Sequence, residues 1–597
     1  MEQELITLGI LFFFALVGGI LAAKFKQPIL LGLLLVGAFI GPKALGLIHD
    51  EGIMDIMIEF GAILMLFVIG LEFDISKLQK IGIKAIIIAV LNSAILTFVG
   101  FVVSLLLGFT VQAALFIGVI LAFGSTVVIV KILENKGLMD RQEVPLLIAI
   151  LIIEDILAVI VITFFSGITD KSTGILGNIE TLIISAIILI LGYMLFVKFI
   201  KPLLAALLKN NASEEITTFT ALALCAGFAY FAYSLKLSPA VGAFMAGSIV
   251  ASLPDTKNFE KAIAPYNLII SSFFFIAIGT LIDFTAIKEN IMIILVLVAT
   301  VVITKIIAFS GLVYLFANMK GDKMFFSSIA MFSVGEFSLL VAKESAHFSP
   351  GIDLVSISAA IVAISAVFMS IAINYSDKVY EPTMDNLPYK IKKKMEQFAA
   401  YIQSVSEELD LDNKYSKGLK KNVFGTLIGT LIVVLAIFAW RKIGTILMSN
   451  NASTMTLTAG YLTTTVIITI GLFYIIFRAK NALKSLSEVF ANATNARSVV
   501  QSRIVVKRAF FAFTLLGVAL FWPFAMFLGN IPTAFVTVSF VLLIIAIWQL
   551  HKIARETHNE SYTEKESFPI YKKVNNNYHT YKEHHNSAKN INNGWKI

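Results

Sequence analysis

Two adjacent carboxylates, Glu154 and Asp155, lie in the middle of the apolar stretch "LLIAILIIEDILAVIVITFF", residues 146–165. A lysine, Lys305, lies in the middle of a second apolar stretch, "VVITKIIAF". A charged side chain at the centre of a bilayer costs roughly 2.5 to 3.5 kcal/mol even on a lenient insertion scale. Three such groups need a role, and a carboxylate at this depth can ligate a small cation or take up a proton.

The two acids are expected to have different partners. Successive residues of a helix point about 100° apart, so Glu154 and Asp155 cannot face one group equally. We expect one acid to pair with Lys305 while the other faces a water-filled cavity. A structural ion pair that locks two helices would explain only one of the acids.

The composition indicates whether these three groups belong to a soluble protein or to a membrane protein. The chain has 597 residues, of which 58% are hydrophobic and 14% are charged, and its mean hydropathy is +0.87. Soluble domains carry roughly 25% charged residues. The chain is therefore predicted to be an all-α polytopic membrane protein. Its single cysteine, Cys225, excludes a disulfide framework and a cysteine-based metal site.

Apolar runs of the length needed to cross a bilayer, about 20 residues, follow one another almost without interruption. Before residue 380 we predict thirteen helices, at 4–22, 28–42, 57–73, 82–107, 112–134, 143–166, 178–205, 215–234, 238–253, 266–283, 288–317, 323–346 and 353–375. With the N-terminus outside, the outward connections hold only about a third as many basic residues as the inward ones. The positive-inside rule thus predicts an outer N-terminus and a cytoplasmic C-terminus.

The predicted helices contain an internal repeat. Three short motifs recur 209 or 210 residues later: "GLLLVG" at 32–37 as "GAFMAG" at 242–247, "GLEFD" at 70–74 as "GTLID" at 279–283, and "FGST" at 123–126 as "FSVG" at 332–335. This offset pairs helix one with eight and six with thirteen, which leaves helix seven as a connector. Each helix is thus paired with the one seven helices later. Because seven is odd, paired helices cross the membrane in opposite directions, and the two halves have opposite topology, an arrangement typical of secondary transporters.

The third motif pair predicts two interrupted helices at equal depth. The residues concerned are small or polar, namely Gly124, Ser125, Thr126, Ser333, Gly335 and Glu336. A break would free backbone groups that side chains, water or an ion must satisfy. Close packing through small residues is the alternative for one cluster, but a symmetric pair favours interruption.

Seven segments resemble those of the monovalent cation:proton antiporter family, in particular NapA-type sodium/proton and Kef-type potassium/proton exchangers. The resemblance covers residues 5–376 and is carried by "QPILLGLLLVGAFIGP", "GAILMLFVIGLEFD", "LAFGSTVVIVKILENKG", "IIEDILAV", "LSPAVGAFMAGSIVAS", "FFFIAIGTLID" and "FSVGEFSLL". It implies a homodimer with a dimer domain (helices one to three and eight to ten). It also implies a mobile transport domain (helices four to six and eleven to thirteen) with crossed interrupted helices.

The resemblance also implies roles for the three central charges. Asp155 matches the family's ion-binding aspartate, and Lys305 matches the basic residue that pairs with the position before it. That position is Asp in many electrogenic sodium exchangers, Asn in electroneutral ones and Gln in typical Kef proteins. Glu154 departs from all three, so neither the cation, Na⁺ or K⁺, nor the stoichiometry is determined.

The chain continues beyond the antiporter-like domain, residues 1–376. We predict a charged cytoplasmic linker at 377–423, an accessory module of four membrane helices at 424–548, and a polar, disordered cytoplasmic tail at 549–597. The accessory helices are expected at 424–440, 456–477, 509–528 and 531–548. They carry no central charge, and no G-x-G-x-x-G fingerprint of a nucleotide-binding domain follows residue 376.

The sequence therefore predicts a plasma-membrane transporter, not an enzyme, that exchanges Na⁺ or K⁺ for protons by alternating access. Its partners would be lipid, the transported ions and a second copy, with no cofactor and no nucleic acid. A cation channel would need a filter sequence, which is absent. A sodium-coupled organic-solute symporter or a non-transporting sensor on the same fold is the alternative, although the Glu154, Asp155 and Lys305 set favours bare ions.

Overall fold

A computed structural model of the chain describes most of residues 2–375. The gaps are residues 26, 49–50, 73–74, 168–184, 186, 212, 254–255, 318, 320–321 and 349–350. Short stretches between residues 418 and 526, and residues 536–563, are also described. Most of the expected linker, accessory module and tail, and the last two residues of the motif at 70–74, lie outside the described residues.

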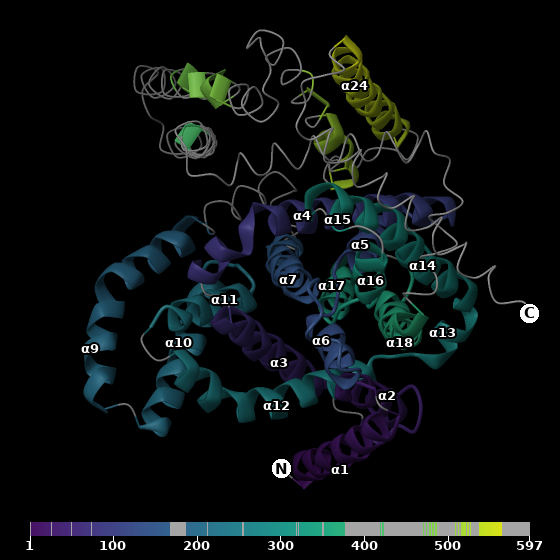
Figure 1. Cartoon of the computed structure of the whole chain (residues 1–597). Helices are drawn as coiled ribbons and strands as arrows, with labels where there is room; N and C mark the ends of the chain where they lie inside the picture. Colours follow the sequence, from purple (N-terminus) through teal and green to yellow (C-terminus); the bar gives the residue numbers. More distant parts are fainter. Residues whose placement is uncertain are drawn as a thin grey trace, which may run out of the picture.

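Every regular element of the described residues is a helix (Figure 1). Within this part of the chain, nine helices are long and apolar enough to cross a membrane, with mean hydropathies of 1.5 to 2.9. The protein is thus an all-helical polytopic membrane protein.

Nine of the expected helices correspond to single helices. They are α1 (Glu2–Lys24), α2 (Ile29–Ile40), α3 (Glu51–Glu72), α4 (Ile75–Leu106), α7 (Val144–Gly167), α10 (Glu214–Ser234), α11 (Pro239–Ala251), α12 (Thr256–Thr280) and α18 (Leu354–Ala372). Expected helix seven is described in part, with a π-helical turn η1 (Phe196–Ile200) followed by α9 (Lys201–Asn211).

Three expected helices are divided. The range 112–134 holds α5 (Val111–Ala122) and α6 (Thr126–Asn135), and the range 323–346 holds α16 (Asp322–Ala330) and α17 (Phe337–Ser345). The range 288–317 holds α14 (Ile291–Thr304), the π-helical turn η2 (Lys305–Phe309) and α15 (Ser310–Ala317), preceded by the short helix α13 (Phe284–Glu289).

The first of two groups of helices consists of α1, α2, α3, α10, α11 and α12, and we call it the glycine bundle. Its closest helix pairs meet at glycines: a Cβ on Gly247 of α11 would overlap the Phe67 carbonyl oxygen of α3, and one on Gly37 of α2 would overlap that of Ile276 of α12. Without side chains at these positions the backbones approach closely, which is how helices gain packing energy in lipid.

The second group consists of α4 to α7 and α14 to α18, and we call it the polar bundle. Helix α4 packs on α5, α7, α14 and α15, and α17 packs on α5, α7 and α18. In Figure 1 helices α14, α16, α17 and α18 of this group lie to the right of α10 and α11. The breaks between α5 and α6 and between α16 and α17 lie inside this bundle.

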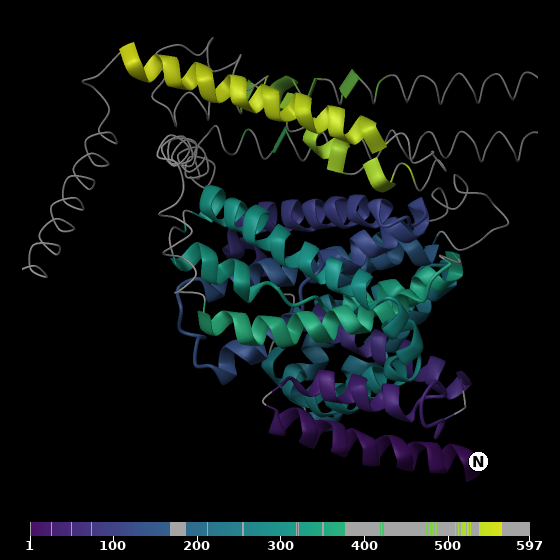
Figure 2. The ribbon, with the colours of Figure 1, turned by 90° about the vertical axis from the view of Figure 1, so that its right-hand side faces the viewer.

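Described parts of the C-terminal region pack on the outside of the polar bundle. The ring of Phe98 in α4 lies 5.9 Å from that of Phe540 in α24 (Val536–Thr563), and the ring of Phe164 in α7 lies 6.0 Å from that of Phe524. Figures 1 and 2 show α24 on the side of the molecule opposite α1. Helix α24 continues to Thr563, into the range expected to form the polar tail.

Candidate functional site

The two helix breaks cross each other and are joined by their backbones. Gly124 and Val334 form an isolated antiparallel bridge. The Ser125 amide donates to the Ser333 carbonyl at 3.3 Å, and the Gly335 amide donates to the Phe123 carbonyl at 2.9 Å. A Cβ on Gly335 would lie 2.5 Å from the Gly124 carbonyl oxygen, so this crossing requires glycine.

Serine hydroxyls satisfy further backbone groups near the crossing. Ser365 Oγ of α18 accepts the Val334 amide at 3.0 Å, and Ser338 Oγ of α17 donates to the Ile120 carbonyl at 2.5 Å. Ser125 caps α6, because its Oγ accepts the Val128 amide at 3.2 Å. Buried polar backbone groups need such partners, so these serines make the breaks tolerable in a membrane interior.

Three consecutive residues of the first break each bind a different acid. The Gly124 amide donates to Glu154 Oε2 at 3.0 Å. Ser125 Oγ donates to Glu336 Oε2 at 2.6 Å, and Thr126 Oγ1 donates to Asp155 Oδ2 at 2.8 Å. Glu154, Asp155 and Glu336 are 0%, 5% and 5% exposed, so the break gathers three nearly buried acids.

Lys305 approaches one of these acids. Its Nζ lies 3.9 Å from Glu154 Oε1, and both side chains are buried. Lys305 begins the π-helical turn η2, and its Nζ lies 5.4 Å from the centre of the Phe309 ring. Within the described residues Lys305 Nζ has no hydrogen-bond partner. The pair is thus an ion pair at the long end of the usual range, not a hydrogen-bonded one.

The sequence analysis missed one residue of this site, Asn92 of α4. Its Nδ2 donates to Glu154 Oε1 at 2.6 Å, and the residue is 1% exposed. The available signal was a single amide in the middle of the apolar run 82–107.

The described residues contain no group of three or more His, Cys, Asp or Glu side chains placed to hold a metal ion. Each acid is instead bound by neutral hydroxyl or amide donors. Such an arrangement suits a cation of single charge, for which one carboxylate and neutral oxygens are sufficient.

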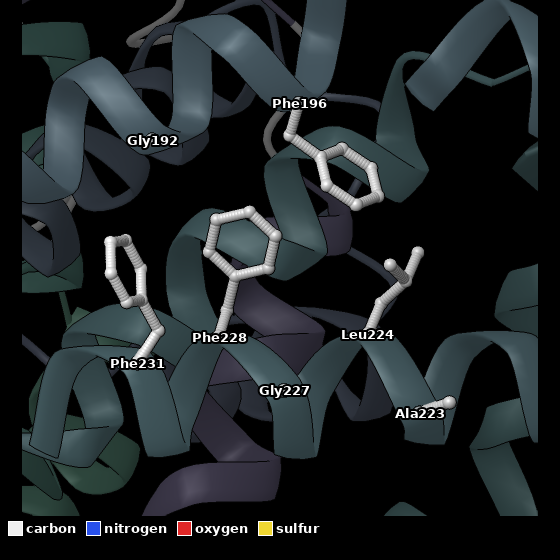
Figure 3. Close-up of a pocket in the computed structure, with 7 residues that line it drawn as sticks. All are labelled: Gly192, Phe196, Ala223, Leu224, Gly227, Phe228 and Phe231. Atoms are coloured by element: carbon white, nitrogen blue, oxygen red, sulfur yellow. The ribbon is translucent and has the colours of Figure 1, made fainter. Parts of the chain in front are cut away.

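A cavity of about 380 Å³ lies elsewhere, between the described part of the connector and α10 (Figure 3). Its lining is apolar, with the rings of Phe196, Phe228 and Phe231 and the side chain of Leu224. None of its described lining residues is charged, and none of them meets the helix breaks.

A family model described as sodium/hydrogen exchanger, transmembrane, matches residues 11–374. The chain belongs to this family. It is 28% identical over 353 residues to the Na(+)/H(+) antiporter of Enterococcus hirae, covering 57% of this chain and 91% of that protein. It is 32% identical over 333 residues to the Na(+)/H(+)-K(+) antiporter GerN of Bacillus cereus, covering 54% of this chain and 83% of that protein.

A solved structure, that of the sodium proton antiporter MjNhaP1 from Methanocaldococcus jannaschii, matches with a TM-score of 0.43 at 16% identity. The match covers 63% of this chain and 98% of that chain. At this score the likeness adds nothing to the assignment, which rests on the family model.

Proposed function

We propose that the chain is a secondary active transporter that exchanges Na⁺ or K⁺ for protons by alternating access. The observation that carries the proposal is the convergence of Glu154, Asp155 and Lys305 on the crossing of two broken helices. Family membership and the names of the relatives support the same reaction.

Asp155 is the group at which the cation and the proton compete. It is 5% exposed, and Thr126 Oγ1 donates to its Oδ2. A charged carboxylate is costly in this interior, so either a proton or a bound monovalent cation stabilises Asp155. Binding of one ion displaces the other, and movement of the site between the two membrane faces converts this competition into exchange.

Glu154 and Lys305 balance each other's charge. Glu154 is bound through Oε2 by the Gly124 amide and is approached at Oε1 by Lys305 Nζ. An uncompensated charge in this position would be strongly destabilising. When a cation enters beside Asp155, its charge repels the Lys305 ammonium, so the pair responds to ion binding.

The architecture has a static part and a moving part in this proposal. The glycine bundle is the dimer domain of a homodimer, and the polar bundle moves against it with the site. The thirteen helices of residues 1–376 form two inverted six-helix repeats around a connector. The repeated motifs and the division of both 112–134 and 323–346 into two helices support this arrangement.

The chain lies in the plasma membrane with its N-terminus outside and its C-terminus in the cytoplasm, as the distribution of basic residues favours. The four helices expected at 424–548 form an accessory module. Its described parts touch α4 and α7 through the contacts of Phe540 with Phe98 and of Phe524 with Phe164.

The test is exchange by the purified protein in liposomes that contain a fluorescent pH probe. Adding Na⁺ or K⁺ outside should drive protons out, so the lumen becomes alkaline with at least one of the two cations. A protein that gives no pH change with either cation is not an exchanger of these ions. A pH change that requires an added organic solute would favour the symporter alternative.

A further inference from the structure

Asn92 is buried at the centre of α4, and only one end of its amide is engaged. Its Nδ2 donates to Glu154 Oε1 at 2.6 Å. Within the described residues its Oδ1 has no hydrogen-bond partner, although the residue is 1% exposed. A buried carbonyl oxygen without a partner is unfavourable, so an acceptor of this kind at a functional site requires an explanation.

A second unsatisfied group lies beside the same carboxylate. Lys305 Nζ is 3.9 Å from Glu154 Oε1, the oxygen that also accepts from Asn92. The ammonium has three protons to donate and makes no hydrogen bond within the described residues. The two side chains that carry these unsatisfied atoms thus both contact one carboxylate oxygen, Glu154 Oε1.

The distances rank the two partners of this oxygen. The Asn92 contact, at 2.6 Å, is a short hydrogen bond, whereas the Lys305 contact, at 3.9 Å, is beyond hydrogen-bond range. The amide, and not the ammonium, is therefore the hydrogen-bonded partner of Oε1. The other oxygen, Oε2, accepts the Gly124 amide.

We infer that Asn92 is the alternative partner of Lys305. When a transported cation repels the Lys305 ammonium from Glu154, Asn92 Oδ1 accepts a hydrogen bond from that ammonium. The inference rests on the proposed function and adds a positioning residue to it. A charged ammonium that leaves Glu154 needs another acceptor in this dry interior. With Oδ1 available, Lys305 can stay protonated while the cation is bound, and the affinity for the cation depends on Asn92.

The inference predicts shifts of opposite sign for two substitutions. Asn92→Leu removes the acceptor, so Lys305 stays on Glu154 or must lose a proton. The KM for the cation should rise roughly tenfold, the equivalent of one hydrogen bond to a charged group, and the pH profile should move to more alkaline pH. Asn92→Asp replaces the amide donor to Glu154 with a second carboxylate, so the two acids share a proton at low pH. Once that proton is lost, the added carboxylate is a stronger acceptor for Lys305, so KM should fall at alkaline pH.

A purely structural role of Asn92 would not give this pattern, because damage to packing would raise KM or lower the maximal rate in both variants. Ser93→Ala is the matched control. Ser93 is the next residue of α4 and is 7% exposed, and its Oγ has no hydrogen-bond partner within the described residues. The KM of the Ser93→Ala variant for the cation should equal that of the wild type.

The experiment measures exchange in proteoliposomes over a range of pH, together with the thermal shift that Na⁺ or K⁺ produces in detergent. Equal KM values in the wild type and both Asn92 variants, or shifts of the same sign at alkaline pH, would overturn the inference while the proposed function stands. A wild-type protein that neither exchanges nor is stabilised by either cation would overturn the proposed function itself. If Asn92→Leu does not fold, Asn92→Ser replaces it, and an unchanged KM in that variant would also contradict the inference.

Discussion

The glycine bundle and the polar bundle face the same membrane but differ in what they bury. The buried acidic and basic residues of the described chain are Glu143, Glu154, Asp155, Lys305 and Glu336, and all five belong to the polar bundle or the turn that precedes α7. The buried polar residues of the glycine bundle are uncharged: Thr217, Thr218, Ser248 and Thr280.

The two bundles also differ in how their helices are held together. Repeated-motif glycines such as Gly37, Gly242 and Gly247 of the glycine bundle lie against the backbone of a neighbouring helix. Serine, threonine, asparagine and acidic side chains connect the helices of the polar bundle. Close apolar packing has few alternative arrangements, whereas a polar network can exchange partners, which fits the proposed static role of the glycine bundle and the proposed movement of the polar bundle.

The largest effect is expected from removing the charge of Asp155 in the polar bundle. Asp155→Asn keeps the shape of the side chain but abolishes its charge and its proton, so exchange should fall to the background of empty liposomes. Asp140→Asn, an exposed position in the same bundle, is the control and should exchange like the wild type. Near wild-type exchange by Asp155→Asn would remove Asp155 from the mechanism.

Neutralising one member of the central pair should cost stability. Lys305→Gln leaves Glu154 without its cation, and breaking a buried pair in this way costs roughly 3 to 5 kcal/mol. The double variant, Glu154→Gln with Lys305→Gln, should recover part of this loss. A double-mutant cycle on thermal unfolding measures the coupling, expected at about 0.5 to 3 kcal/mol. Strictly additive losses would mean that Lys305 has another partner.

A methyl group can test the packing of the glycine bundle. Gly247→Ala forces a Cβ onto the Phe67 carbonyl and should destabilise the protein by about 1 to 3 kcal/mol. Gly227→Ala is the matched control in the same bundle, because no atom lies within 4 Å of its Cβ position. Equal unfolding temperatures for the two variants would show that close backbone approach does not hold this bundle.

Removing the accessory region should leave exchange intact. A chain ending near residue 385 loses the contacts on Phe98 and Phe164, and each aromatic pair is worth about 0.5 to 1.5 kcal/mol beyond its buried area. The truncated protein should insert, exchange cations and unfold at a slightly lower temperature. If a well-folded truncated protein fails to exchange, the last helices belong to the transport path.

The smallest effect concerns Asp283, at the end of the glycine bundle. The Thr285 amide, together with the Ala286 amide and Lys43, 3.6 Å away, lowers the pKa of this carboxyl below its usual range. A lowered folded-state pKa stabilises the fold above the unfolded pKa of about 4, and this contribution is lost as the pH falls through the folded value. Asp283→Asn keeps the helix cap, so its unfolding temperature should differ from that of the wild type near pH 7 and converge with it below about pH 4. A difference that persists at low pH would exclude the charge as the cause.

The sequence by itself determined the class of the protein and the depth of its charges. Apolar runs of the length of a bilayer fix where helices can lie, and the position of Glu154, Asp155 and Lys305 within such runs places them near the centre. Small residues around Gly124 and Gly335 predicted breaks, and α5 ends at Ala122 while α17 begins at Phe337. These features depend on local composition along the chain.

Only the tertiary structure decided which groups meet. Asn92 reaches Glu154 across 62 positions, and Ser125 reaches Glu336 across 211. Such contacts depend on the rotation of each helix about its axis and on the rotamers chosen in packing, which no local pattern encodes. For this reason the tertiary structure, and not the sequence, determined that the Asn92 amide lies closer to the Glu154 carboxylate than the Lys305 ammonium does.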